Sequence, residues 1–256
     1  MRLVRFDYQQ QIRYGILTDQ TIWPLQKLPF DELRETGETI PWDAVRLLAP
    51  CEPSKIVALG LNYRDHAAEL KMLLPTEPLI FLKPSTAVIG PEADIVYPSQ
   101  SQQVDYEAEL GVVIGRTAHR VAEAAAQDYI LGYTCFNDVT ARDLQKQDSQ
   151  FTRSKSFDTF APLGPWIETE IGDPDNLNLA ALVNGEHRQQ GNTQDMVFRV
   201  TTLISFISHI MTLLPGDVIA TGTPAGIGPL QPGDVVEIRV EGIGTLRNRV
   251  VVDSHE

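Results

Sequence analysis

The sequence predicts an α+β protein in which strands dominate and a small N-terminal unit precedes a larger domain. Short runs of β-branched and aromatic residues recur along the chain between Gly, Pro and Asn, whereas few segments carry the apolar spacing of a helix. Residues 1–50 hold no group of catalytic side chains and end at Pro50. We therefore expect a packing unit over 1–50 and the main domain over 51–256.

Composition and charge disfavour several classes of protein. Apolar residues make up 43% of the 256 residues and charged residues 21%, as in ordinary globular domains. The net charge of −13 repels phosphate backbones, so no nucleic-acid partner is expected. No apolar run approaches the roughly 20 residues of a membrane helix, and the N-terminus lacks the apolar core of a signal peptide. Two cysteines are too few for a disulfide framework, so we expect a cytoplasmic protein that binds no membrane.

The elements follow from these patterns in order. Strands are expected at 3–8, 13–17, 56–59, 79–83, 104–114, 133–137, 177–183, 184–190, 235–240 and 245–252. The dipeptide Asn184-Gly185 predicts a type I′ turn between two of them. Helices are expected at 31–38, from Asn62 or Asp65 to about Leu74, at 121–129, from Asp138 through Gln145, and at 202–213.

Two acidic residues in the expected strand 104–114 suggest a metal site. Glu107 and Glu109 are two residues apart, so they project from the same face, and a cation between them would relieve their repulsion. Asp138 follows the strand 133–137 and offers a third oxygen. Asp is also a favoured N-cap, and by itself the capping interpretation of Asp138 would prevail. Together the three acids predict a site for a hard cation, Mg²⁺ or Mn²⁺.

Further polar residues form a second candidate group. His66 and Glu69 share a face of the expected helix, where a carboxylate can orient an imidazole that activates water. A surface contact is the more frequent explanation of such a pair taken alone. Lys155 lies in an aromatic, proline-rich loop, and Gln145 lies about two turns beyond Asp138 on one expected helix. The glycine-rich segment 215–228 lets backbone amides approach a ligand, but it lacks the Gly-Lys-Ser/Thr of a Walker A motif.

Several segments in order, from about Lys55 to Val252, resemble the fumarylacetoacetate hydrolase family. They are G-L-N-Y-R-D-H-A-A-E, F-L-K-P-S, D-Y-E-A-E-L-G-V-V-I-G, N-D-V-T-A-R-D-L-Q, K-S-F-D-T-F-A-P-L-G-P, V-N-G-E and G-D-V-I-A-T-G-T-P-A-G-I-G. The resemblance implies a mixed β-roll or barrel-like core with flanking helices, usually as a homodimer. It also implies that residues 1–50 are the short appendage that many members carry.

The resemblance also implies roles for individual residues. The metal ligands would be Glu107, Glu109 and Asp138, and the catalytic residues would be His66, Glu69 and Lys155. The substrate-binding residues would be Arg64, Lys83, Gln145 and Thr223. Some acylpyruvases carry Arg directly before the Asn-Tyr pair, where this chain has Leu61, with Arg64 three residues later, so the residue that binds the substrate carboxylate stays open.

The resemblance and the residues lead to one chemistry, enolate formation from a small anionic 2-oxo acid at a bound Mg²⁺ or Mn²⁺. Acylpyruvate hydrolysis, with water activated by His66, and oxaloacetate decarboxylation are the expected reactions. Oxaloacetate keto–enol tautomerisation, or isomerisation of a 2-hydroxymuconate-type diacid, is the alternative. The K-S-F-D-T-F-A-P-L-G-P segment resembles the tautomerase branch. A non-catalytic scaffold with a structural metal is the alternative of another class.

Overall fold

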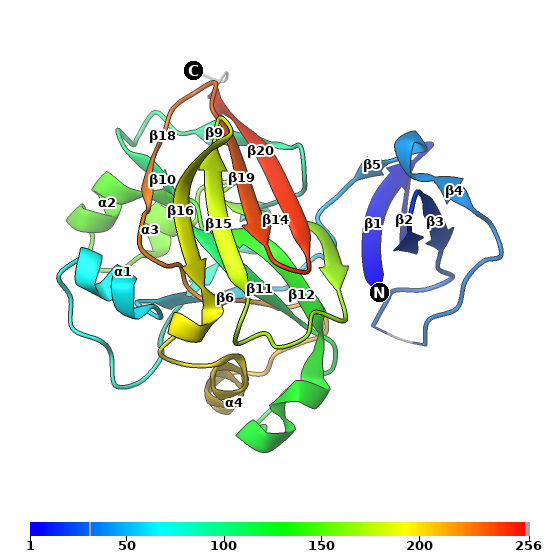
Figure 1. Cartoon of the computed structure of the whole chain (residues 1–256), viewed down its shortest axis with the longest axis horizontal. Helices are drawn as coiled ribbons and strands as arrows, with labels where there is room; N and C mark the ends of the chain where they lie inside the picture. Colours follow the sequence, from blue (N-terminus) through cyan, green and yellow to red (C-terminus); the bar gives the residue numbers. More distant parts are fainter. Residues whose placement is uncertain (31, 254–256) are drawn as a thin grey trace.

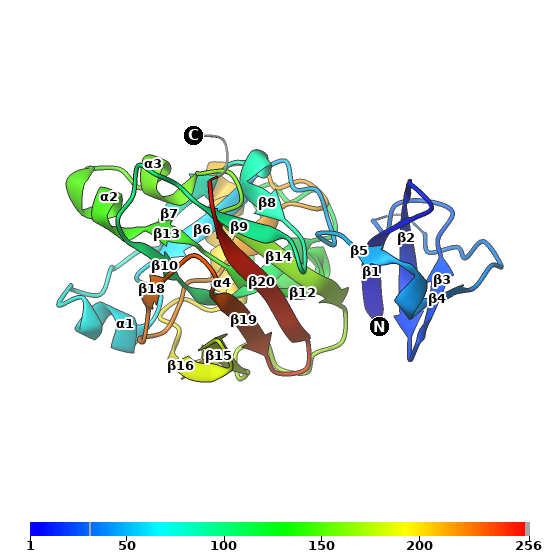
Figure 2. The ribbon, with the colours of Figure 1, turned by 90° about the horizontal axis from the view of Figure 1, so that it is seen from above.

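Strands dominate the computed structural model, which describes residues 1–30 and 32–253 (Figures 1 and 2). They form three sheets of twelve, three and five strands, with short helices at the periphery. The mainly-β prediction is confirmed. Within the described residues the sheets do not close into a barrel, since the largest runs open from β4 to β7. No helix in the described part of the chain is long and apolar enough to span a membrane.

The largest sheet carries the functional region and also joins the N-terminal residues to the core. Its main path has the order β4-β3-β2-β1-β14-β12-β11-β17-β6-β7, with β5 on β1 and β8 on β14. The bounds are β1 Arg2–Tyr8, β2 Gln11–Thr18, β3 Thr21–Pro24, β4 Ile40–Pro41, β5 Arg46–Leu47, β6 Ile56–Gly60, β7 Leu79–Lys83, β8 Val88–Ile89, β11 Ala108–Ile114, β12 Ile130–Asn137, β14 Ala161–Glu168 and β17 Val218–Ala220. The antiparallel pairing of β1 with β14 makes the N-terminal strands, at the right of Figure 1, continuous with the main sheet.

The two smaller sheets complete the core. The three-stranded sheet contains β10 Val104–Tyr106, β13 Thr140–Ala141 and β18 Gly228–Leu230. The five-stranded sheet contains β9 Asp94–Tyr97, β15 Asn178–Val183, β16 Glu186–Asn192, β19 Val235–Val240 and β20 Gly244–Val252. Strands β15 and β19 contact β11, and buried residues from both sheets form one apolar cluster. Asn184 and Gly185, with φ of 54° and 81°, form the turn between β15 and β16 as the sequence predicts.

The helices are shorter than the sequence suggests. They are α1 Arg64–Glu69, α2 Arg142–Gln147, α3 Thr152–Lys155 and α4 Val200–Ile210, with 3-10 helices η1 Trp42–Ala44, η2 Ser85–Ala87, η3 Glu123–Tyr129 and η4 Thr193–Asp195. The helix expected to reach Leu74 ends at Glu69, because Lys71 adopts φ 55° and the Met72 N–H bonds back to the Ala67 carbonyl. Residues 32–38 contain no helix, and Asp31 lies outside the described residues.

The expected strand 104–114 is divided at Glu107 into β10 and β11. The Glu107 N–H bonds to the side-chain oxygen of Asn137, and the Ala108 N–H bonds to that of Gln189. Side chains thus accept hydrogen bonds where a continuous strand would use a backbone partner. The break leaves Glu107 between two sheets, at the edge of the functional region.

Candidate metal centre and active site

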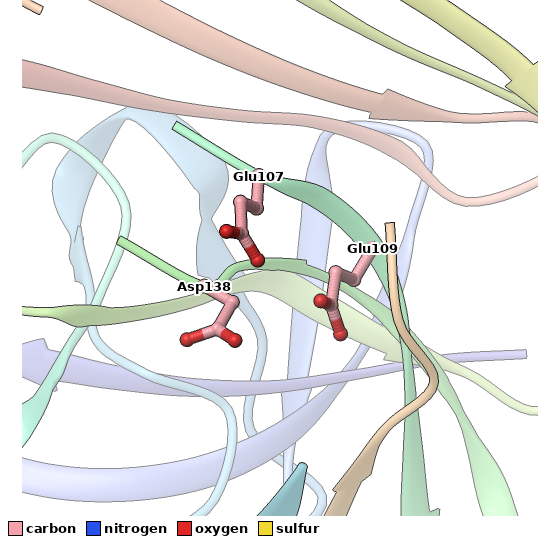
Figure 3. A group of neighbouring side chains, drawn as sticks. All are labelled: Glu107, Glu109 and Asp138. Carbon is pink, nitrogen blue, oxygen red and sulfur yellow. The ribbon is translucent and has the colours of Figure 1, made fainter. Parts of the chain in front are cut away.

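Three buried carboxylates meet where β11 begins and β12 ends. Glu109 lies in β11, Glu107 directly precedes that strand, and Asp138 directly follows β12. The antiparallel register pairs Ala108 with Asn137, and the Asp138 N–H donates to the Glu107 carbonyl at 3.0 Å. One oxygen from each side chain lies within 4.8 Å of the others, and all three side chains are buried (Figure 3). The acids that the sequence assigns to a metal are therefore neighbours in space.

Glu109 has fewer hydrogen-bond donors than a buried carboxylate needs. Its Oε2 accepts a hydrogen bond from the Gly222 N–H at 2.8 Å, whereas its Oε1 is buried without a partner in the described structure. Burial, and then the negative charges of Asp138 and Glu107, raise the pKa of Glu109 well above its usual range. A cation among the three carboxylates would satisfy the orphaned oxygen and reverse this effect. The donor set, oxygens only, suits Mg²⁺ or Mn²⁺.

The other two acids are neutralised by cationic side chains. Lys155 Nζ lies 2.9 Å from Glu107 Oε2 and 2.6 Å from Asp138 Oδ2. Lys83 Nζ, fully buried, bonds to the other oxygen of Asp138, and the Arg142 guanidinium bonds to Glu107. Burial opposes the ionisation of Glu107, but Lys155 and Arg142 outweigh it and lower the pKa of this carboxyl. Glu107 is thus held ionised, ready to ligate a cation.

Asp138 does not cap a helix. Helix α2 begins at Arg142, and the short strand β13, Thr140–Ala141, separates it from Asp138. Both carboxylate oxygens of Asp138 bond to lysines instead. The capping interpretation is therefore wrong. Gln145 also does not share a helix with Asp138, although it does reach the same region.

A cavity of about 360 Å³ opens beside the acidic cluster. Its polar lining residues are His66, Glu107, Arg142, Gln145, Lys146, Lys155 and Thr223. Its apolar lining residues are Leu59, Leu61, Leu70, Met72, Phe81 and Phe151. The volume suits a small molecule, and a few convergent polar groups among apolar walls are typical of a substrate site.

The His66–Glu69 pair lies on α1, and its histidine is at the wall of this cavity. His66 Nδ1 is 3.0 Å from Glu69 Oε2, and His66 is 6% exposed. The Nδ1 contact leaves Nε2 as the nitrogen able to accept a proton. The start of α1 is fixed by Asn62, whose amide group donates to the carbonyls of Phe198 and Thr221. His66 therefore lines the cavity, and Glu69 contacts it from the exposed side of α1.

The proposed substrate-binding residues fall into two groups. Gln145 and Thr223 line the cavity, although the Thr223 hydroxyl already donates to the Ala108 carbonyl and accepts from Gln189. Lys83 is fully buried beneath the acidic cluster, bonds to Asp138, and is not among the lining residues. Arg64 is exposed on α1 and likewise does not line the cavity. The structure thus brings the first two residues to the cavity and leaves the other two outside it.

Arg142 is a site residue that the sequence interpretation missed. Its Nε donates to Asp105 at 2.8 Å, and its other nitrogens bond to Glu107 and, at 2.6 Å, to Gln145. It therefore links an acid of the cluster to a polar wall residue. Arg142 stands in the N-D-V-T-A-R-D-L-Q segment, but its acidic partners lie more than thirty positions earlier, so no local pattern marks it.

Comparisons with known proteins agree with this geometry. The family profile described as "Fumarylacetoacetate (FAA) hydrolase C-terminal" matches residues 55–251, and "Rv2993c-like, N-terminal" matches residues 1–50. The human protein "Oxaloacetate tautomerase FAHD2B, mitochondrial" is 42% identical over 83% of this chain and 71% of its own length.

Two solved structures are similar over nearly their whole length. The 5-carboxymethyl-2-hydroxymuconate delta-isomerase of Mycobacterium smegmatis has a TM-score of 0.94 and 44% identity, covering 99% of this chain and 100% of its own. The maleylpyruvate hydrolase of Sphingobium sp. SYK-6, solved with manganese(II) ion and pyruvate, has a TM-score of 0.82 and 32% identity, covering 98% of this chain and 99% of its own. These relatives are named as enzymes: a tautomerase, an isomerase and a hydrolase. The chain belongs to the fumarylacetoacetate hydrolase family.

Proposed function

We propose that this protein is a divalent-metal-dependent enzyme that cleaves a carbon–carbon bond in a small 2-oxo acid. The reactions proposed are acylpyruvate hydrolysis, oxaloacetate decarboxylation, or both. The observation that carries the proposal is the buried cluster of Glu107, Glu109 and Asp138, with an unpartnered Glu109 oxygen, beside a small cavity. A similar hydrolase that holds manganese and pyruvate supports this choice of metal and substrate class.

Glu107, Glu109 and Asp138 would hold the ion. Bound there, Mg²⁺ or Mn²⁺ would supply Lewis acidity that polarises the 2-oxo group and favours its enolate. Lys155 reaches the same region and lines the cavity, so its ammonium would add positive charge where the enolate oxygen develops. Gln145 would hold a polar group of the substrate from the cavity wall.

In hydrolysis, His66 would act as the general base. Glu69 holds Nδ1, so Nε2 accepts a proton from water while the water oxygen bonds to the distal carbonyl carbon. The carbon–carbon bond then breaks, the acyl fragment leaves as a carboxylic acid, and the bonding electrons remain on the pyruvate fragment as its enolate. Protonation of the enolate carbon gives pyruvate. With oxaloacetate the bond to the distal carboxylate breaks instead, releasing carbon dioxide without added water.

Tautomerisation of oxaloacetate is the second candidate, because the human relative at 42% identity is named an oxaloacetate tautomerase. In that reaction a proton moves between carbon and oxygen and no carbon–carbon bond breaks. The same residues would hold the substrate, and His66 would move the proton.

Turnover of a substrate panel tests the proposal. Acetylpyruvate, oxaloacetate and a 2-hydroxymuconate-type diacid would be offered to the metal-depleted protein with and without Mg²⁺ or Mn²⁺. We expect metal-dependent pyruvate release from at least one of the first two. The variant His66→Ala should lose hydrolysis of acetylpyruvate, whereas His209→Ala, at an exposed histidine of α4, should retain it. Enol–keto interconversion without pyruvate release would favour the tautomerase, and no turnover with any metal would contradict enzymatic function on these acids.

A further inference from the structure

One loop contacts both halves of the candidate site through three of its backbone amides. The Gly222 N–H donates to Glu109 Oε2 at 2.8 Å, on the metal side. The Ala225 N–H donates to Asp65 Oδ2 at 3.2 Å, and the Gly226 N–H donates to Glu69 Oε1 at 3.0 Å, on the side of helix α1. The loop 222–226 therefore connects a candidate ligand to the helix that carries His66.

Each of the two carboxylates on α1 contacts this loop through one oxygen and His66 through the other. Asp65 Oδ1 accepts the backbone N–H of His66 at 2.8 Å, while its Oδ2 faces the loop. Glu69 Oε2 contacts His66 Nδ1 at 3.0 Å, while its Oε1 faces the loop. Backbone and ring of His66 are thus each tied to a carboxylate that the loop anchors.

The loop can serve as an anchor because its own conformation is constrained. Gly226 has φ +101°, and a Cβ there would lie 3.0 Å from the carbonyl oxygen of Arg188. The side chain of Gln189, 2% exposed, donates from Nε2 to the Thr223 hydroxyl at 2.7 Å and to the Pro224 carbonyl at 2.6 Å. Helix α1 has only six residues, which is too short for independent helical stability. The loop 222–226 is therefore more rigidly held than helix α1.

We propose that Asp65 and Gly226 are positioning residues, which hold the His66–Glu69 pair in register with the acidic cluster through the loop 222–226. This inference rests on the proposed hydrolytic role of His66. Asp65 acts on the backbone of His66 and Gly226 acts on Glu69, and neither residue lines the cavity. Replacing either residue would change the orientation of the His66 imidazole. The three carboxylates that hold the ion would keep their positions.

Two substitutions at Asp65 test whether this residue anchors α1 to the loop or only stabilises the start of the helix. Asp65→Ala removes both acceptor oxygens. Asp65→Asn keeps one, so it can retain the bond to the His66 N–H or the bond to the Ala225 N–H but not both. Gly226→Ala, which forces the loop away from Arg188, tests the same link from the other side. Glu77→Gln, at an exposed acid beyond α1 without a hydrogen bond in the described structure, is the matched control.

The measurements are kcat and KM for acetylpyruvate, the Kd for Mn²⁺, and amide hydrogen exchange of residues 64–69. We expect kcat to fall about 10- to 100-fold in Asp65→Ala, as for a misplaced catalytic group, and to a smaller extent in Asp65→Asn. Gly226→Ala should lower kcat as Asp65→Ala does. Exchange at 64–69 should accelerate, while KM and the Kd for Mn²⁺ stay within about twofold.

Wild-type kcat in both Asp65 variants would overturn the inference. So would wild-type kcat in Asp65→Asn with a loss only in Asp65→Ala, because a helix-start role would then suffice. An equal loss of Mn²⁺ affinity would also overturn it, because the residues would then act on the metal side. His66→Ala distinguishes the two levels: if it hydrolyses acetylpyruvate at the wild-type rate, the proposed base itself is wrong, whatever Asp65 does.

Discussion

Replacing Glu109 by Gln should stabilise the metal-free protein and weaken its response to metal, two effects of opposite sign. The carboxyl is fully buried, one of its oxygens has no partner in the described structure, and two further carboxylates lie close by. An amide of the same shape removes the charge and still offers an oxygen to the Gly222 N–H. It removes a ligand charge as well.

The magnitude follows from the separation of the acids. Two unit charges at the outer limit of 4.8 Å repel by about 3 kcal/mol at an effective dielectric constant of ~20. Lys155, Lys83 and Arg142 offset part of this repulsion, so we expect a gain of ~1–3 kcal/mol. For a chain of this size each kcal/mol changes Tm by about 2–4 °C. The metal-free variant should thus melt several degrees above the metal-free wild type.

Calorimetric melting of both proteins, in chelator and then with Mn²⁺, measures the two effects together. Mn²⁺ at about 100 times its Kd should stabilise the wild type by about 2.7 kcal/mol, and Glu109→Gln should lose most of that increase. A variant that melts below the wild type in chelator would refute the electrostatic reasoning. A variant with the full Mn²⁺ response would refute the ligand assignment of Glu109.

Four further predictions concern stability and reactivity. Lys83→Met should lower the free energy of unfolding in urea by about 3–5 kcal/mol, because it breaks a fully buried ion pair with Asp138. Burial raises the pKa of the Cys51 and Cys135 thiols from 9.0 to about 12, so iodoacetamide at pH 8 should react with them about a thousandfold more slowly in the folded than in the unfolded protein. The same shift favours the protonated folded state, so this contribution to stability should be lost as pH rises from about 9 to 12. Gly185→Ala should lower the free energy of unfolding by about 1–2 kcal/mol, because φ at this position is +81°. No atom lies near the added Cβ, so a steric clash adds nothing to this loss.

Each of these has a direct control or contrary outcome. Lys27→Met, at an exposed lysine, should leave the unfolding free energy within about 0.5 kcal/mol, and an equal loss there would remove the argument from the buried pair. Rapid alkylation of the folded protein would show that the thiols are accessible. Gly185→Asn should cost less than Gly185→Ala, since Asn adopts positive φ more readily; the reverse order would contradict the turn geometry.

Much of the fold could be predicted because its signals are local. The strand at 235–240 and the turn at Asn184-Gly185 depend on residues next to one another in the sequence, and the structure has both where expected. The helix lengths could not be predicted so well. Helix α1 ends at Glu69 because Lys71 adopts a positive φ, and a lysine in the sequence does not indicate such a conformation.

The site shows the same division. The two-residue spacing of Glu107 and Glu109 indicates a shared face, whatever the rest of the chain does. The role of Asp138 is decided by Lys83 and Lys155, which come from distant segments, so the local N-cap preference misleads. Arg142 likewise depends on acids from a distant segment, Asp105 and Glu107, so its neighbours in the sequence do not indicate its role.

The most direct test of metal-dependent cleavage is a titration of metal-depleted protein with Mn²⁺ while pyruvate release from acetylpyruvate and oxaloacetate is followed. The account predicts no release above the protein-free rate without metal, and activity above that rate that rises with Mn²⁺ until one ion is bound per chain. It also predicts no recovery in Glu107→Gln. Full pyruvate release in chelator, or full recovery by Mn²⁺ in that variant, would contradict the central claim.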